Sequence, residues 1–335
     1  ALDFYGFNGT KTIYHPEWEK QESDKYKSRV FYRHARKLTR VSIDLQKKIP
    51  SCTKFSILAG IAHYNYKLSS VDIQKLNKGK STEDKLPSID SVPGLYEKYI
   101  VWGLIPEDEK NGGTVNYLKT GLIFDSRDNE PNPNKGIWAE AVLACDPGIF
   151  GKQNPMQVKW IGIWRHYITL IKNKLTFAYR IGYQGNIAGH CPFYALPYMH
   201  STMNKTAIPE GLGGAKTTRG ILRNRIIGDD IVYWNLELRS KLYHTKLWKQ
   251  NLYFGLNLFY DGGIITNKVA QDKSRVPESE KAQYFSEESD FMHHSIGTGI
   301  RAAMNQNFIV AFDFGKSLSS NDGNKGIYIG LNYLF

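Results

Sequence analysis

The stretch QNLYFGLNLFYDGGIIT, residues 250–266, alternates between two kinds of position along its whole length. The apolar positions are Leu252, Phe254, Leu256, Leu258 and Tyr260. The mixed positions between them are Tyr253, Gly255, Asn257, Phe259 and Asp261. A period of two is typical of a β-strand with one apolar face. The run exceeds the ~5–6 residues of an ordinary strand and matches the ~9–11 residues that cross a bilayer. It therefore predicts a membrane-crossing strand.

The same alternation recurs along the whole chain, without a convincing amphipathic helix. In residues 231–241 it places Glu237 and Arg239 on the polar face. The last apolar face, which we expect to contact lipid, consists of Ile327, Ile329, Leu331, Tyr333 and Phe335. Eleven strands are predicted, near 27–47, 53–66, 114–125, 136–146, 158–171, 175–184, 230–242, 251–265, 295–304, 308–316 and 327–335.

Short and long connections alternate between these strands. The short ones lie near 48–52, 126–135, 172–174, 243–250 and 305–307; the long ones lie near 67–113, 147–157, 185–229 and 266–294, followed by a shorter one near 317–326. Outer-membrane barrels place short turns in the periplasm and long loops outside the cell. The chain is therefore predicted to be all-β, a transmembrane antiparallel β-barrel of the cell outer membrane.

The number of strands is odd, whereas bacterial single-chain barrels have an even number. An open sheet also leaves an edge strand whose backbone N–H and C=O groups find no hydrogen-bond partners in lipid. We therefore expect residues 1–26 to be an external loop segment and residues 27–335 to be the C-terminal part of a barrel. A missing N-terminal segment or a second chain would supply the other strands.

Composition excludes some classes of protein. The net charge is +12, from 44 Lys and Arg against 32 Asp and Glu. These basic residues are spread along the chain rather than clustered as nucleic-acid binding requires, so no nucleic-acid partner is expected. No apolar run approaches the ~20 residues of a membrane helix. The three cysteines, Cys52, Cys145 and Cys191, lack metal or redox spacing, which leaves a Cys145–Cys191 disulfide or free thiols.

Four motifs occur in a fixed order in the last two-thirds of the chain: Asp125-Ser126-Arg127-Asp128, Thr218-Arg219-Gly220-Ile221, Glu237-Leu238-Arg239 and Phe259-Tyr260-Asp261-Gly262-Gly263. In these the chain resembles the BamA-type outer-membrane superfamily, whose barrels have sixteen strands. Five strands follow the Arg-Gly loop here, as in the family. The resemblance implies that about eleven of the sixteen strands are present, and that the long external loop 185–229 folds inward.

The N-terminal stretch, residues 4–10 (FYGFNGT), loosely resembles the G-N-E-T loop of family members that lack periplasmic repeats. That subgroup includes barrels carried behind a phosphoesterase-like or patatin-like domain. The chain departs from the family at Ile221, where an aromatic residue is common, and it has no periplasmic repeat. The missing repeat weakens the expectation of insertase activity.

Arg219 and Gly220 are the first candidate site residues. Strand parity turns Glu237 and Asp261 inward on adjacent strands, where carboxylates can bind a guanidinium through two hydrogen bonds. The resemblance implies that this arginine locks the loop against the inner wall. In the alternative reading, Glu237 pairs with Arg239 or Lys241 and Arg219 is solvated outside.

Ile329, Leu331, Tyr333 and Phe335 form the second candidate site. They match the terminal apolar and aromatic pattern that barrel assembly machinery recognises in this class of protein, and a free strand can be bound by edge pairing. Their strand would also form the lateral seam. The alternative is an ordinary lipid-facing strand.

No catalytic residue, metal site or cofactor is predicted. His293 and His294 point to opposite faces of a strand, and His190 has no spaced partner. Lys216 and Thr217 lack the glycines of a phosphate-binding loop. Trp160, Trp164, Tyr167 and Tyr179 are expected to belong to the aromatic girdle at the membrane interface.

The expected function is assembly or translocation: a non-enzymatic barrel that assists the insertion of proteins or lipids into the outer membrane, or their passage across it. The alternative is an anchor or scaffold for an attached enzyme domain or partner complex, without transport. A passive pore is disfavoured because the long loop would plug the lumen. Expected partners are outer-membrane lipids and lipopolysaccharide, and barrel assembly machinery during biogenesis.

Overall fold

The computed structural model describes residues 1–149, 156–202, 210–247, 249–305 and 308–335. Parts of the predicted connections 147–157, 185–229, 243–250 and 305–307 lie outside the described residues.

One antiparallel sheet contains every strand of the described chain, in sequence order. The strands are β1 (Leu2–Asp3), β2 (Arg33–Ile49), β3 (Cys52–Ser69), β4 (Thr114–Asp125), β5 (Gly136–Asp146), β6 (Gln157–Ile171), β7 (Leu175–Gly189), β8 (Asp230–Leu247), β9 (Gln250–Asn267), β10 (His293–Met304), β11 (Phe308–Ser317) and β12 (Lys325–Leu331). The eleven long strands match the eleven predicted ones, so the predicted fold class is confirmed. The short strand β1, which pairs with the start of β2, was not predicted.

The period of two in the sequence becomes two faces of the sheet. In β11, Phe308, Val310 and Phe312 are 38–51% exposed on the outer face, whereas Ile309 and Ala311 are buried inside. Other long strands also expose large apolar side chains, for example Ile57 of β3 and Leu122 of β4. An apolar outer face and a polar inner face are what a membrane-spanning barrel wall requires.

The girdle prediction is wrong for Tyr167. Trp160 and Trp164 are exposed on the outer face, but Tyr167 is 1% exposed. It has the same parity as Arg165 in β6, so it points inward beside the buried Arg165 side chain.

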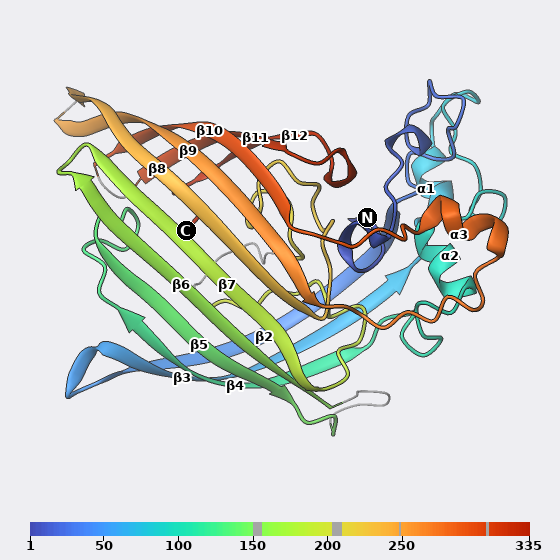
Figure 1. Cartoon of the computed structure of the whole chain (residues 1–335), viewed down its shortest axis with the longest axis horizontal. Coiled ribbons are helices and arrows are strands. Elements are labelled where there is room, and N and C mark those ends of the chain that lie inside the picture. Colours follow the sequence, from blue (N-terminus) through green and yellow to red (C-terminus); the bar gives the residue numbers. More distant parts are fainter. Residues whose placement is uncertain (150–155, 203–209, 248, 306–307) are drawn as a thin grey trace.

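Short and long connections separate to opposite ends of the sheet. Figure 1 shows the hairpin turns at one end and, at the other, the N-terminus with the helices α1 (Ile73–Asn77), α2 (Leu95–Val101) and α3 (Glu278–Tyr284). Single 3₁₀ turns lie at Gly9–Lys11, Pro16–Trp18 and Ser320–Asp322. Among the described residues, every helix is too short or too polar to cross a membrane.

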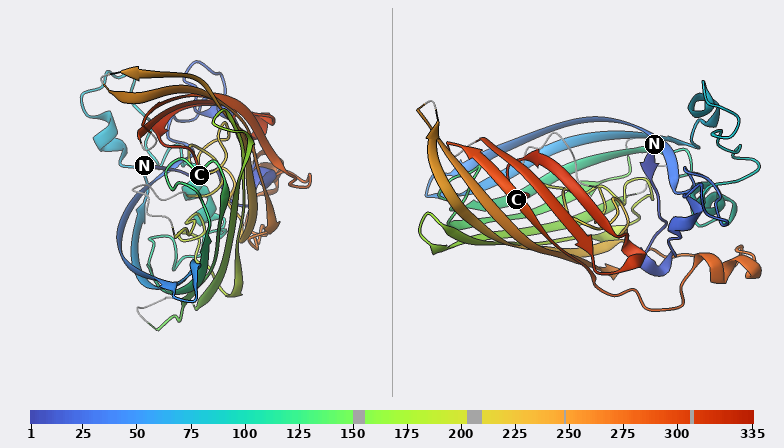
Figure 2. Two further views of the ribbon diagram at one scale, coloured as in Figure 1. Left: turned by 90° about the vertical axis from the view of Figure 1, so that its left-hand side faces the viewer. Right: turned by 90° about the horizontal axis from the view of Figure 1, so that it is seen from above.

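The sheet curves around the inner loops but does not close (Figure 2). Over the described residues, β12 pairs only with β11, and β2 pairs with β3 and with β1. The expectation that further strands complete the barrel stays a prediction.

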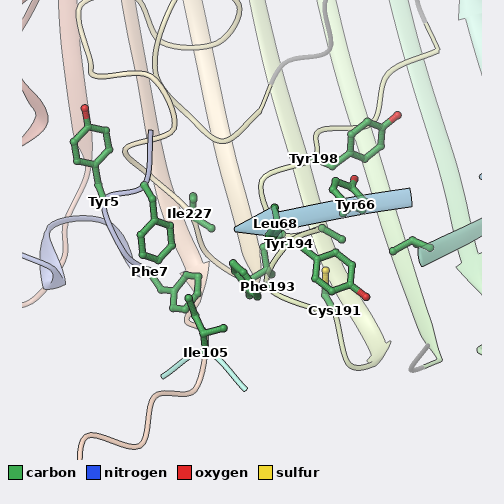
Figure 3. Close-up of a cluster of buried hydrophobic side chains, with 14 of the residues drawn as sticks. Tyr5, Phe7, Tyr66, Leu68, Ile105, Cys191, Phe193, Tyr194, Tyr198 and Ile227 are labelled. Carbon is green, nitrogen blue, oxygen red and sulfur yellow. The ribbon is translucent and has the colours of Figure 1, made fainter. Parts of the chain in front are cut away.

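A large, mainly aromatic cluster of buried side chains packs at the long-loop end and against the inner wall, and Figure 3 shows part of it. It joins the N-terminal segment, the loop before β4, the loop before β8 and the loop before β10, and its largest members include Phe7, Trp18, Tyr99, Trp102, Phe193 and Tyr284. The Phe4 and Tyr99 rings meet edge to face with centroids 5.2 Å apart, an arrangement that aromatic pairs favour. We call this cluster the aromatic cap.

Candidate functional site: the luminal charge network

The described parts of the connection between β7 and β8 lie inside the curved sheet (Figure 2). Its segment from Thr217 to Ile221 is buried. Leu212 and Ile226 pair with each other across the loop, and both pack in a cluster with Tyr233 of the barrel wall. The loop is therefore attached to the inner face of the sheet by apolar contacts as well as by the charges described next. We call residues 210–229 the inner loop.

Gly220 allows the inner loop to touch the wall. Its φ angle is +90°, in the region that L side chains rarely adopt, and a Cβ atom placed there would lie 2.7 Å from the Lys316 backbone nitrogen. Its own backbone N–H donates a hydrogen bond of 2.8 Å to the Tyr328 hydroxyl of β12. Only glycine meets both demands without strain.

Arg219 is 1% exposed and binds Asp261 of β9 through three hydrogen bonds. Its Nε and Nη2 atoms donate to the two carboxylate oxygens at 2.9 and 3.0 Å, and its backbone N–H donates to Oδ2 at 3.0 Å. Two parallel bonds between a guanidinium and a carboxylate are among the strongest charge-assisted contacts in proteins. They fix both the position and the orientation of the loop.

Two further carboxylates and one ring surround the same guanidinium. Arg219 Nη2 lies 2.7 Å from Glu237 Oε1, and Nη1 donates to Asp313 Oδ2 at 3.4 Å. The guanidinium carbon lies 3.5 Å from the centre of the Phe259 ring, within the range of a cation–π contact. The structure thus brings together the predicted residues Arg219, Glu237 and Asp261.

Asp313 and Phe259 were not predicted as site residues. Both lie on the polar-parity face of their strands, so the alternation alone could have identified them.

The positive and negative side chains of this network are equal in number. Arg239 Nε donates to Glu237 Oε2 at 2.8 Å, and Arg301 donates to both Asp313 oxygens at 2.8 and 3.1 Å. Three guanidinium groups therefore face three carboxylates. The alternative pairing of Glu237 with Arg239 is present together with the Arg219 contact, because the two arginines approach different oxygens.

The predicted strand 327–335 ends early, and its last residues point the other way. Ile327, Ile329 and Leu331 are 62–78% exposed on the outer face, but Tyr333 and Phe335 are buried inside. Asn332 has a φ angle of +64°, and this left-handed residue ends the alternation after Leu331. The expectation that Tyr333 and Phe335 share the lipid-facing side is wrong.

Arg239 holds this inward tail. Its guanidinium lies 4.1 Å from the Tyr333 ring centre and 4.9 Å from that of Phe335. Its Nη2 atom also donates to the Phe335 main-chain oxygen at 2.9 Å. Arg239 was expected only as an alternative partner of Glu237. It also connects the charge network to the last residues of the chain.

Arg225 is a second anchor of the inner loop, and no sequence pattern predicted it. Its fully buried guanidinium donates to the main-chain oxygens of Gly9, Thr12 and Asn321, each at 2.9 Å. The carboxylate of Asp322 lies 3.9 Å from its Nε atom. Arg225 thus ties the loop to the N-terminal segment and to the turn before β12.

His293 joins the same segments from the wall. Its Nδ1 lies 2.8 Å from Asp322 and its Nε2 lies 3.2 Å from Asp290, whose other oxygen accepts the Thr10 backbone N–H at 2.7 Å. Burial by itself raises the pKa of Asp290, but hydrogen bonds from His293 and Thr10 outweigh it and lower that pKa. Both ring nitrogens are occupied by different carboxylates, and the described residues hold no cluster that fits a metal ion.

Comparisons with known proteins agree with this geometry. The family model described as the Omp85 superfamily domain matches residues 6–335. A crystal structure of BamA from Haemophilus ducreyi lacking POTRA domains 1–3 is similar, with 15% identity, a TM-score of 0.54, and coverage of 89% of this chain and 55% of that chain. CdiB from Escherichia coli gives 11% identity, a TM-score of 0.52, and coverage of 88% and 44%.

The chain therefore spans about half the length of both structures. No curated protein matches it. At such low identity the two structures support the fold alone, whereas the family model covers almost the whole sequence. With its antiparallel barrel wall and inward arginine-bearing loop, the chain belongs to the Omp85 superfamily of outer-membrane β-barrels.

Proposed function

We propose that this barrel assists the insertion of proteins into the outer membrane, or their passage across it, at a lateral seam formed by β12. The observation that carries the proposal is the state of that strand. β12 has seven residues, pairs only with β11 among the described strands, and exposes Ile327, Ile329 and Leu331 on its outer face. An edge strand with free backbone groups is a template for another strand.

Arg219 has a supporting role in this proposal. By binding Asp261, Glu237 and Asp313 it keeps the inner loop in the lumen, so a polypeptide enters the seam from the side rather than through the barrel. Tyr333 and Phe335 turn inward onto Arg239, so the paired part of β12 ends at Leu331. The long loops, including residues 1–26, would face the outside and the short turns the periplasm, as outer-membrane barrels place them.

The test uses an edge-blocking substitution. Ile329→Lys puts a charge on the outer face of β12, a device by which natural edge strands resist pairing. Leu258→Lys is the matched control, because Leu258 also lies on the outer face but in the central strand β9. Proteoliposomes containing the full protein would be mixed with a urea-unfolded outer-membrane barrel, and folded client would be measured by its altered gel mobility.

We expect insertion to fall strongly with Ile329→Lys and to remain near the unsubstituted level with Leu258→Lys. Equal insertion by both variants, or none above empty liposomes, would contradict the proposal. In cells, deletion of the gene should lower the amounts of other outer-membrane barrels.

One observation favours the anchor as a second candidate. The inner loop is attached at both Arg219 and Arg225, and the aromatic cap packs at the long-loop end, which suits a rigid barrel that transports nothing. An anchor predicts unchanged levels of other barrels after deletion of the gene, together with a stable partner that purifies with the protein.

A further inference from the structure

A wide pocket opens at the short-turn end of the barrel, away from the charge network. Its volume is 1160 Å³. Its lining includes Lys172, Lys174, Lys241, Lys246 and His244, together with Leu242, and it contains no acidic side chain. Such a lining attracts negative charge.

A β-bulge aims part of this positive charge into the lumen. The register of β8 against β9 shifts between Lys241 and Tyr243, which leaves Leu242 as an extra residue that is 71% exposed. Beyond the shift, His244 stands opposite Tyr253 and Lys246 stands opposite Asn251. Opposed residues share a face, and Tyr253 is buried on the inner face, so the bulge turns His244 and Lys246 inward.

The nearest acids already have partners. In the turn between β4 and β5, Arg127 binds the Asp125 carboxylate at 2.9 and 3.0 Å. Asp128 accepts the backbone N–H groups of Asn134 and Lys135 within its own turn. Among the described residues, Lys172, Lys174 and Lys246 form no ion pair, and Glu130 of the same turn does not line the pocket.

We propose that this pocket binds a carboxylate-rich polypeptide segment that approaches the lumen from the short-turn end. Lysines and asparagine amides can donate hydrogen bonds both to acidic side chains and to peptide carbonyl groups. The volume exceeds the ~300–1,000 Å³ usual for small-molecule sites, as an extended peptide requires. This inference does not rest on the proposed function, because an anchor protein would keep the pocket too.

The lumen-facing position disfavours a lipid. On the outer face, β9 presents Phe254, 41% exposed, whereas the register turns His244 and Lys246 of β8 to the opposite face. A phospholipid headgroup beside the wall would therefore meet apolar side chains rather than these lysines.

The experiment measures fluorescence anisotropy of a labelled peptide of alternating Glu and Ser, with the full protein in phosphatidylcholine nanodiscs at low salt. A peptide of alternating Gln and Ser is the matched ligand. The test variant is Lys172→Gln/Lys174→Gln/Lys246→Gln. The control variant, Lys78→Gln/Lys80→Gln/Lys85→Gln, removes the same charge from exposed lysines in the loop between β3 and β4.

We expect the acidic peptide to bind and the Gln peptide not to bind. The test variant should weaken binding about tenfold, since each exposed pair contributes modestly, and the control variant less than about twofold. Circular dichroism would show that both variants fold.

Four results would overturn the proposal: no binding of the acidic peptide, equal losses in both variants, binding of the Gln peptide, or displacement by inorganic phosphate at concentrations similar to those of the peptide. Binding of phosphatidylglycerol vesicles that is stronger than peptide binding and depends on the same lysines would assign the site to lipid instead.

Discussion

The inner loop is anchored by two arginines six positions apart, and they use different chemistry. Arg219 binds carboxylates on three barrel strands, whereas Arg225 binds main-chain oxygens of two irregular segments. Loss of Arg219 leaves buried negative charge in the wall. Loss of Arg225 mainly leaves neutral carbonyl oxygens without donors, because the nearby Asp322 carboxylate also contacts His293. The first contact therefore governs the position of the loop relative to the barrel, and the second governs the packing of the external segments.

The largest effect is expected from Arg219→Gln. Asp261 would lose its guanidinium partner while it remains buried, whereas Glu237 would keep Arg239 and Asp313 would keep Arg301. Removal of one member of a buried ion pair costs about 3–5 kcal/mol. Thermal unfolding in detergent would measure the loss.

Asp261→Asn should recover part of that stability in the Arg219→Gln background, because the unpaired charge disappears. Additive losses in the double variant would show that the two side chains are not coupled.

Arg225→Gln should cost less, about 2–3 kcal/mol, because it leaves buried carbonyl oxygens without donors while the Asp322 carboxylate keeps its contact with His293. The damage should be confined to the long-loop end. Limited proteolysis should cut within residues 1–32 in this variant, while the barrel strands remain resistant. Cleavage that is as slow as in the unsubstituted protein would contradict the assigned contacts.

Gly220→Ala should cost about 1–2 kcal/mol, from the left-handed backbone and the approach to Lys316 together. Gly214→Ala is the matched control. Its φ is +82°, but the nearest atom to an added Cβ is a side-chain atom at 3.3 Å. A larger loss at Gly214 than at Gly220 would argue against close packing of the Arg-Gly turn on the wall.

The smallest effect is expected at His190, where the connection between β7 and β8 begins. A hydrogen bond of 2.6 Å from His190 Nε2 to the Glu109 carboxylate raises the pKa of His190, so the folded pKa lies above the unfolded one. This pair stabilises the fold fully below the unfolded pKa and loses its effect as pH rises through the folded pKa. Because the His190 side chain is 60% exposed, the effect is small.

His190→Gln should therefore lower the melting temperature by about 1 °C at acidic pH and leave it unchanged at alkaline pH. A decrease in melting temperature of the same size at both pH values would show that protonation of His190 does not contribute.

The wall and the Arg219 contacts could be predicted from sequence because both follow from strand parity. The alternation of apolar and polar residues identifies each strand and turns Glu237 and Asp261 inward. Resemblance then supplied the loop residue that meets them. The inward turn of Tyr333 and Phe335 was not predicted, because the apolar alternation in the sequence continues to Phe335. The left-handed backbone of Asn332 nevertheless ends the strand after Leu331.

The second anchor could not be predicted for a different reason. Arg225 meets Gly9 and Thr12, which lie more than two hundred residues away, through main-chain oxygens that every residue possesses. Irregular segments have no periodicity to assign a direction to a side chain. Only the three-dimensional packing of the aromatic cap places these segments together.

Hydrogen–deuterium exchange of the inner loop tests the central claim most directly. In the unsubstituted protein, amides of residues 217–222 should exchange slowly, and in Asp261→Asn they should exchange fast while β8 and β9 remain protected. Slow exchange of these amides in Asp261→Asn, or fast exchange already in the unsubstituted protein, would contradict the claim that the Arg219–Asp261 contact holds the loop inside the barrel.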